Sequence, residues 1–186
     1  MDKRNSAEVT LSKGSHTHAV PLKLFALNRS RLVGALKNTK KIQDNALVLL
    51  QGGSSCPLYD TDVEYDVFRQ ESYFHWAFGV YEPDFYGVIE MTTGRSILFA
   101  PRLSEDYVVW MGQLPTLDEY KEKYQVDEVY FSDEIVQVLQ SKSPSVLLTL
   151  AGVNTDSDLH AIEATFKGIE KFKVDNQILF PVIAEW

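Results

Sequence analysis

The residues of this chain with the clearest potential for metal chemistry are its four histidines. His16 and His18 are separated by one residue, so an extended backbone would present both imidazoles on one face, as some metal sites do. No third ligand lies near them, and a solvated pair in a polar segment is the stronger interpretation. His75 stands among aromatic residues and is interpreted as packed and hydrogen-bonded, and His160 follows a polar loop. We therefore expect no metal site in this chain.

Two stretches of alternating acidic residues partly match the ligand spacing of a calcium-binding loop. In residues 60–71 the position that needs glycine for the sharp turn is Tyr65. In residues 154–165 the glycine position is Leu159 and the closing glutamate position is Thr165. Solvated acidic loops are the better interpretation of both stretches.

Nucleophilic and phosphate-binding motifs are missing from the sequence. It contains no P-loop, no G-x-S-x-G elbow and no dinucleotide fingerprint. Cys56 is the single cysteine and carries no signature of a nucleophile. We therefore predict no catalytic residue in this chain.

The composition predicts one globular domain. The chain has 186 residues, of which 45% are hydrophobic, and its net charge is -8. An acidic surface argues against nonspecific nucleic-acid binding, which needs clustered Lys and Arg. No apolar run approaches the ~20 residues of a membrane-spanning helix, and no signal peptide is recognisable. With a single cysteine, we expect a cytoplasmic protein. Residues 1–20 are polar and are predicted to be a flexible lead-in to a domain over residues 21–186.

Several apolar runs predict strands. Ala46–Leu50 and Ser145–Leu150 are uninterrupted apolar runs of the kind that form buried strands. Tyr86–Glu90 and Arg95–Ala100 are separated by a short segment that ends in Gly94, which indicates a hairpin. Val129–Phe131 is a further predicted strand.

Helices are predicted between these strands. Apolar residues recur after Pro21 at the spacing of one helix face, over roughly four turns. Thr116 and Glu119 form a capping-box pattern before a short helix through Tyr124, and Ser132 is predicted to cap a helix through Gln140. Because helices alternate with strands and a hairpin interrupts them, the predicted fold is α/β (α+β), a mixed sheet flanked by helices.

One segment is too specific to be an ordinary core element. Phe68–Gly79 reads FRQESYFHWAFG and resembles the F-R-Q-(D/E)-S-x-F-x-(Y/W)-x-x-G segment in the amino-terminal domain of the prolidase and aminopeptidase P family. Further similar segments follow the same order along the chain: PLKLFALNRSRL (21–32), VLLQGG (48–53), LFAPRL (98–103), VWMGQ (109–113), LLTLAGVNTDS (147–157) and FKGIEKFKVDNQILFPVIAEW (166–186). The resemblance covers residues 21–186.

The resemblance implies the amino-terminal domain type of the creatinase and prolidase fold. It also implies a parent protein that hydrolyses dipeptides with a carboxy-terminal proline, as a homodimer. In the family, two manganese ions are held by two Asp, one His and two Glu of a separate catalytic domain with the pita-bread fold. None of those ligand motifs occurs in this chain, which stops where the family enters that domain. We therefore expect the chain alone to be inactive and its partners to be its own catalytic domain and a second subunit.

The resemblance also bears on individual residues. Phe74, Trp76 and Phe78 are interpreted as core aromatics, and Arg69 as a buried or half-buried ion-pair partner. Trp110 lies in a region predicted to be a polar loop after Pro101, where tryptophan is more typical of a partner contact than of packing. In the family a tryptophan in the matching W-M-G context borders the substrate pocket of the partner subunit, so Trp110 is the predicted pocket contact in trans.

A non-enzymatic alternative is also compatible with the sequence. Domains of this type occur in non-catalytic proteins, including a histone chaperone subunit, where they bind peptides. The net charge of -8 would suit a basic partner. The similarity to prolidase up to the domain junction favours the peptidase interpretation.

Overall fold

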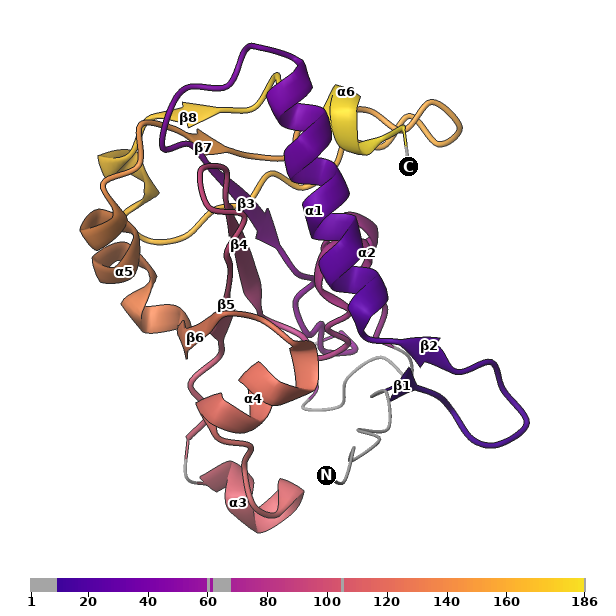
Figure 1. The fold of residues 1–186 in the computed structure, drawn as a ribbon. Helices are drawn as coiled ribbons and strands as arrows, with labels where there is room; N and C mark the ends of the chain where they lie inside the picture. Colours follow the sequence, from indigo (N-terminus) through magenta and orange to yellow (C-terminus); the bar gives the residue numbers. More distant parts are fainter. Residues whose placement is uncertain (1–9, 60, 62–67, 105, 186) are drawn as a thin grey trace, which may run out of the picture.

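A computed structural model describes residues 10–59, 61, 68–104 and 106–185, and for Val108, Trp110 and Met111 it describes the backbone alone. Within these residues a six-stranded sheet runs in the order β6-β5-β4-β3-β7-β8 (Figure 1). Its strands are β3 (Leu47–Gln51), β4 (Tyr86–Glu90), β5 (Ser96–Ala100), β6 (Glu128–Phe131), β7 (Leu147–Leu148) and β8 (Val174–Asp175).

The sheet is mixed, as predicted. β4 pairs antiparallel with β3 and with β5, whereas the pairs β3–β7, β5–β6 and β7–β8 are parallel. Consequently β3, β5, β6, β7 and β8 all run in one direction. Their carboxyl ends, and the amino end of β4, meet at the same edge of the sheet.

Helices cover both faces of this sheet (Figure 1). One face carries α1 (Lys23–Asn38), α2 (Ser72–Phe78) and α6 (Leu179–Ile183), and the other carries α5 (Ile135–Lys142) and the 3-10 turn η2 (Ile169–Lys171). The remaining elements are α3 (Asp106–Met111), α4 (Leu117–Tyr124), the 3-10 turn η1 (Ser132–Glu134), and the short strands β1 (Thr10–Leu11) and β2 (Val20–Pro21).

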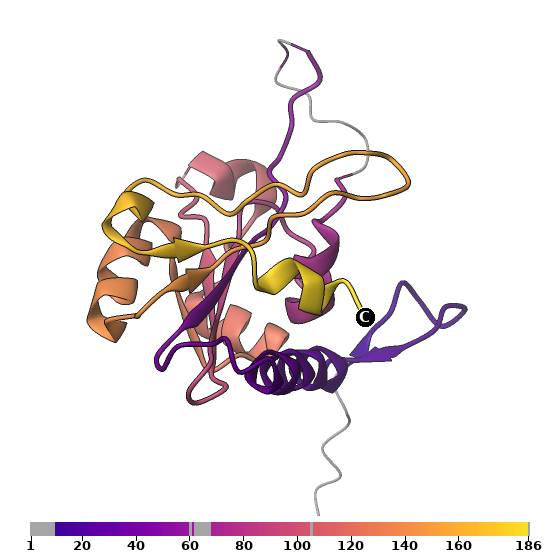
Figure 2. The same ribbon diagram turned by 90° about the horizontal axis from the view of Figure 1, so that it is seen from above.

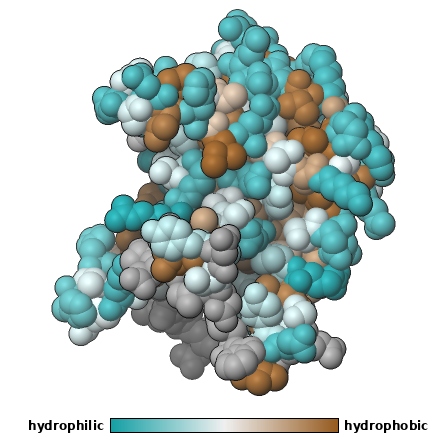
Figure 3. Space-filling model, turned by 180° about the vertical axis from the view of Figure 1, so that it is seen from behind, coloured by the Kyte–Doolittle hydropathy of each residue, from teal (hydrophilic) through white to brown (hydrophobic). Residues whose placement is uncertain are grey.

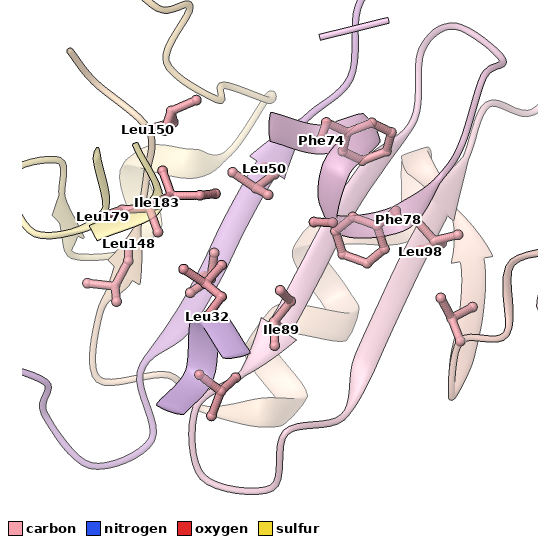
Figure 4. Packing of buried hydrophobic residues seen from close by; sticks show 14 of the residues in the cluster. Leu32, Leu50, Phe74, Phe78, Ile89, Leu98, Leu148, Leu150, Leu179 and Ile183 are labelled. Atoms are coloured by element: carbon pink, nitrogen blue, oxygen red, sulfur yellow. The ribbon is translucent and has the colours of Figure 1, made fainter. Parts of the chain in front are cut away.

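Alternation along the central strand divides the core into two layers. Val48 and Leu50 pack toward α1 and α2, and Leu47 and Leu49 pack toward α5. All four side chains are buried, which explains why the strand is apolar at consecutive positions. Burying each of them contributes roughly 1.5–3 kcal/mol relative to exposure. Figure 4 shows the first layer, in which Leu50 and Ile89 of the sheet belong to the same cluster as Leu32 of α1 and Phe78 of α2.

The local signals in the sequence agree with most of these elements. The first helix begins at Lys23, two residues after Pro21 of β2, and buries the predicted stripe. Gly94 adopts a φ of 75° in the β4–β5 hairpin. Both hydrogen bonds of the predicted Thr116–Glu119 capping box are present at α4.

Two local predictions differ from the structure. Ser132 was predicted to cap a helix through Gln140, but residues 132–134 form η1 and α5 begins at Ile135. The Glu134 carboxylate accepts a hydrogen bond from the Phe131 amide at 3.0 Å, so Glu134 rather than Ser132 caps this turn. Within the predicted flexible lead-in, Thr10–Leu11 pairs antiparallel with Val20–Pro21.

Candidate functional site

The connections that leave the carboxyl edge of the sheet form the candidate site, because ligands of open α/β sheets bind at that edge. Residues 52–71 follow β3, residues 101–116 follow β5, and residues 149–168 follow β7. Residues 79–85 precede β4 and lie at the same edge. Figure 2 shows the segment after β3 and the hairpin after β7 projecting beyond the sheet.

Gln70 fixes the start of the connection after β3. Its side-chain oxygen accepts a hydrogen bond from the Gly53 amide at 2.5 Å, and its amide nitrogen donates to the Glu82 carbonyl at 2.8 Å. The neighbouring Gly52 amide donates to the Phe85 carbonyl at 2.8 Å. Gln70 therefore ties the exit of β3 to the entry of β4, a role that the sequence analysis missed.

The aromatic segment after Gln70 forms α2, which Glu71 caps. The Glu71 carboxylate accepts hydrogen bonds from the amides of Tyr73 and Phe74 at 3.2 and 2.6 Å. Burial raises the pKa of Glu71 above its ordinary value, although these hydrogen bonds oppose the shift. Phe74 and Phe78 are fully buried, which confirms their predicted place in the core. Trp76 is half-buried against the same cluster.

The buried arginine of this region is not the one that the sequence analysis selected. Arg69 is exposed, so its predicted burial is wrong. Arg29 is only 4% exposed and donates to the carbonyls of Ala77 and Gln125, both at 2.9 Å. Burial lowers the pKa of Arg29 to about 10, against the opposing attraction of Asp127. The sequence could have indicated the burial of Arg29, because position 29 lies on the apolar stripe of the first helix.

An acidic and aromatic cluster fastens α4 to the segment before β4. Glu82 accepts a hydrogen bond from Lys123 at 2.5 Å and another from the Tyr124 hydroxyl. Lys123 also lies 4.3 Å from the centre of the Tyr81 ring. Burial, together with the Glu82 carboxylate, raises the pKa of Tyr124, so its phenol stays protonated. The cluster therefore ties α4 to this edge of the sheet.

The segment that contains Trp110 is helical. It forms α3, so the loop predicted after Pro101 is wrong for residues 106–111. The Trp110 side chain lies outside the described part of the structure, and its pocket contact stays a prediction. Tyr107 and Val109 of the same helix are exposed, at 49% and 81%.

The four histidines all lie within the described part of the chain. Among the described residues, no group of three or more His, Cys, Asp or Glu is placed to hold a metal ion. His16 and His18 are exposed between β1 and β2, and His160 is exposed as well. His75 is exposed too, but its Nδ1 lies 3.2 Å from the Val80 carbonyl, which agrees with the predicted hydrogen bond.

The two acidic stretches have different outcomes. Residues 60, 62, 64 and 66 of the first lie outside the described part of the chain. In the second, the Asn154 side chain accepts hydrogen bonds from the amides of Asp156 and Ser157, at 2.9 and 3.1 Å. This carbonyl oxygen closes a turn, which agrees with the predicted solvated loop.

Within the described ranges, no helix has the length and hydropathy that a membrane crossing needs.

Exposed apolar side chains gather on the connections at the carboxyl edge. They are Tyr59 after β3, Tyr81 before β4, Leu103, Tyr107 and Val109 after β5, and Val153, Leu159 and Ile162 after β7. We call these eight residues the carboxyl-edge surface. They are distributed over four connections that meet at this edge of the sheet.

Comparison with known proteins identifies the family. Residues 25–146 match a family model described as the aminopeptidase P, N-terminal domain. The Xaa-Pro dipeptidase of Mus musculus is 53% identical over 176 residues, which cover 95% of this chain and 36% of the mouse protein. The Homo sapiens Xaa-Pro dipeptidase is 54% identical over 172 residues, which cover 92% of this chain and 35% of the human protein. The chain thus spans about a third of the length of the curated relatives it matches.

Solved structures agree in fold. Aminopeptidase P from E. coli superposes with a TM-score of 0.58 at 24% identity, over 75% of this chain and 31% of that chain. The Pseudomonas aeruginosa aminopeptidase PepP gives a TM-score of 0.58 at 22% identity, over 75% of this chain and 30% of that chain. These two similarities show the fold alone. The family model covers more than half of the residues, so this chain belongs to the aminopeptidase P amino-terminal domain family.

Proposed function

We propose that this chain is the non-catalytic amino-terminal domain of a dimanganese Xaa-Pro dipeptidase. The observation that carries the proposal is the 53% identity to the mouse Xaa-Pro dipeptidase over 95% of the chain. The parent protein would hydrolyse dipeptides with a carboxy-terminal proline. A cytoplasmic location belongs to the proposal and rests on the single cysteine.

The described residues do not fit a dimanganese centre, since no group of three or more metal-ligating side chains converges in them. Two such ions require several carboxylate and imidazole ligands. The manganese of the parent enzyme would therefore be held by the part of the relatives that this chain does not span.

The carboxyl-edge surface supports a role in assembly and in shaping the pocket. Its connections include α3, on which Trp110 lies beside the exposed Tyr107 and Val109. In the proposed homodimer, α3 would reach the pocket of the partner subunit and Trp110 would pack against the proline ring of the substrate. A flat indole there would limit substrates to two residues and exclude water.

The test uses a Xaa-Pro dipeptidase of the relatives' length with this chain as its amino-terminal part. We expect Trp110→Ala to lower kcat/KM for Gly-Pro by about tenfold or more, a loss of about 1.4 kcal/mol of transition-state stabilisation. Trp110→Phe should retain part of the activity, and the melting temperature should change little. Leu24→Ala, at an exposed position of α1 outside the carboxyl-edge surface, is the control and should leave the kinetics unchanged. Normal kinetics with a lowered melting temperature for Trp110→Ala would reject the pocket role.

The second candidate is a peptide- or histone-binding module of a non-catalytic protein. The net charge of -8 and the exposed apolar edge would suit a basic peptide. Titration of the chain with histone tail peptides separates the two functions. Saturable micromolar binding would favour the module, and absence of binding would favour the peptidase domain.

A further inference from the structure

The hairpin of residues 152–162 exposes its apolar side chains rather than burying them. Val153 is 42%, Leu159 70% and Ile162 79% exposed. The hairpin extends from the molecule beside α6 (Figures 1 and 2), and its lobe, at the upper left of Figure 3, carries hydrophobic residues. We propose that this hairpin is a docking element for the peptidase portion that the longer relatives carry, an inference that rests on the proposed function.

The hairpin is preorganised by its own backbone. Val153 and His160 form an antiparallel bridge, and the Ala161 amide donates to the Gly152 carbonyl at 2.8 Å. At the tip, the Asp158 amide donates to the Asn154 carbonyl at 2.8 Å, in addition to the turn closed by the Asn154 side chain. A preorganised arm loses little conformational entropy on binding, so its exposed side chains are suited to an interface.

Side chains from the sheet hold the far end of the hairpin in place. The Thr149 hydroxyl donates to the Glu163 carboxylate at 2.5 Å. The Thr165 amide donates to the Gln51 side chain and the Tyr86 hydroxyl donates to the Thr165 carbonyl, both at 2.9 Å. Two of these anchors therefore come from strands β3 and β4, and the third comes from the residue that follows β7.

Helix α6 fixes the other end of the hairpin. A Cβ atom added to Gly152 would lie 2.3 Å from the Phe180 ring, so the glycine allows the two segments to touch. The apolar side chains consequently have a fixed position relative to the sheet and to α6. Any polypeptide that continues past α6 starts beside the hairpin.

Charge argues against a second copy of the hairpin as the occupant. Asp156 and Asp158 lie at its tip, so pairing two hairpins about a twofold axis would bring four carboxylates together. The peptidase portion, about two thirds of the relatives' length, is the occupant to which length and position point. Its matching surface should have an apolar centre with Lys or Arg at the rim, facing the two aspartates.

Hydrogen exchange measured by mass spectrometry tests this inference. The chain alone is compared with a Xaa-Pro dipeptidase of the relatives' length that contains it. We expect amides of residues 156–162 to exchange at least tenfold more slowly in the longer protein, at every protein concentration. The double variant Leu159→Glu, Ile162→Glu should restore the fast exchange. Leu27→Glu is the control, because Leu27 is 46% exposed on α1 and should leave the protection unchanged.

Each contrary outcome has a definite meaning. Equal exchange in both proteins would overturn the docking role, and protection that grows with protein concentration would overturn the choice of occupant in favour of a second copy. Should the double glutamate variant fail to fold in the isolated chain, Leu159→Ser, Ile162→Ser replaces it. Gly-Pro hydrolysis by the same samples separates the two proposals. Gly-Pro hydrolysis without slowed exchange of residues 156–162 rejects the docking role of the hairpin. Slowed exchange without Gly-Pro hydrolysis rejects the peptidase function.

Discussion

Arg29 shows how one side chain can join elements that are distant in sequence. Its guanidinium links α1 to the carbonyl of Ala77 at the end of α2 and to the carbonyl of Gln125 after α4. It also lies 5.4 Å from the centre of the Phe78 ring. A buried guanidinium with these partners has a structural role rather than a role in substrate binding.

Replacing this side chain should destabilise the fold strongly. Arg29→Met keeps most of the volume but leaves two carbonyls without their donor, so we expect a loss of about 3 kcal/mol in the free energy of unfolding. Urea unfolding measures it. Arg31→Met is the matched control, because Arg31 is exposed on the same helix, and it should change stability by less than about 0.5 kcal/mol. Equal effects of the two variants would contradict the assigned role.

Asp127 gives the fold a dependence on acid pH. Its carboxylate accepts hydrogen bonds from the Ser96 amide and hydroxyl at 2.7 and 2.9 Å. Although burial opposes the shift, these bonds and the charges of Arg95 and Arg29 lower the pKa of Asp127 below 3.8. A lowered pKa contributes stability that is present above the unfolded value and is lost as pH falls through the folded value.

We therefore expect Asp127→Asn to be less stable than the parent chain at pH 7. The difference should shrink as the pH falls below 3.8, since the parent carboxylate then becomes protonated. Urea unfolding at neutral pH and at about pH 3 gives both values. A difference that stays constant with pH would show that the charge of Asp127 makes no contribution.

At the scale of the elements, a glycine follows α2 and another lies in the turn after β4, and the two glycines are needed for different reasons. Gly79 ends α2 with a φ of 69°, and Gly94 closes the β4–β5 hairpin with a φ of 75°. A Cβ atom at Gly79 would lie 2.4 Å from the Phe25 ring, whereas a Cβ at Gly94 would meet nothing within 4 Å. The two positions share backbone conformation and differ in packing.

Substituting alanine at Gly79 and at Gly94 separates the cost of backbone strain from the cost of steric overlap. Gly94→Ala should cost about 1 kcal/mol, from the left-handed conformation alone. Gly79→Ala should cost at least about 2 kcal/mol more, because the buried Phe25 ring must also move. Thermal and urea unfolding of both variants provide the comparison. Similar losses would mean that the core around Phe25 adapts without penalty.

For the whole molecule, the topology concentrates the connections at one edge of the sheet. Within the six-stranded sheet β4 alone runs against the other strands, so five carboxyl ends meet there. The opposite edge carries tight structure such as the β4–β5 hairpin and a charged network in which Lys142 bridges Glu90 and Glu128 at 2.9 and 3.1 Å. Long connections are thus found at one edge of the sheet, and a tight hairpin with a charged network at the other.

The isolated chain should have no metallopeptidase activity. We expect titration calorimetry with manganese to show no tight saturable site and Gly-Pro hydrolysis to stay at background, because the described residues bring no suitable ligand set together. Tight binding of one or two manganese ions would overturn this prediction. The dipeptidase of the relatives' length, measured in parallel, is the positive control.

The sequence by itself determined the elements whose signals are local. The stripe from Leu22 to Leu36, the apolar run of β3 and the Thr116–Glu119 capping box each depend on residues within a few turns of one another. Hydrophobic periodicity and helix capping depend on residues that are close in sequence, so these elements could be predicted from the sequence alone. The specific aromatic segment from Phe68 to Gly79 was sufficient to indicate the family, which the comparisons confirm.

Only the tertiary structure decided which distant residues meet. The partners of Arg29 are 48 and 96 positions away, and the residues around Trp110 form a helix where the sequence predicted a loop. The order of the strands brings Val109 and Leu159 to one edge, although 50 positions separate them. Such contacts follow from how strands pair and layers pack, which neither propensity nor spacing along the chain encodes.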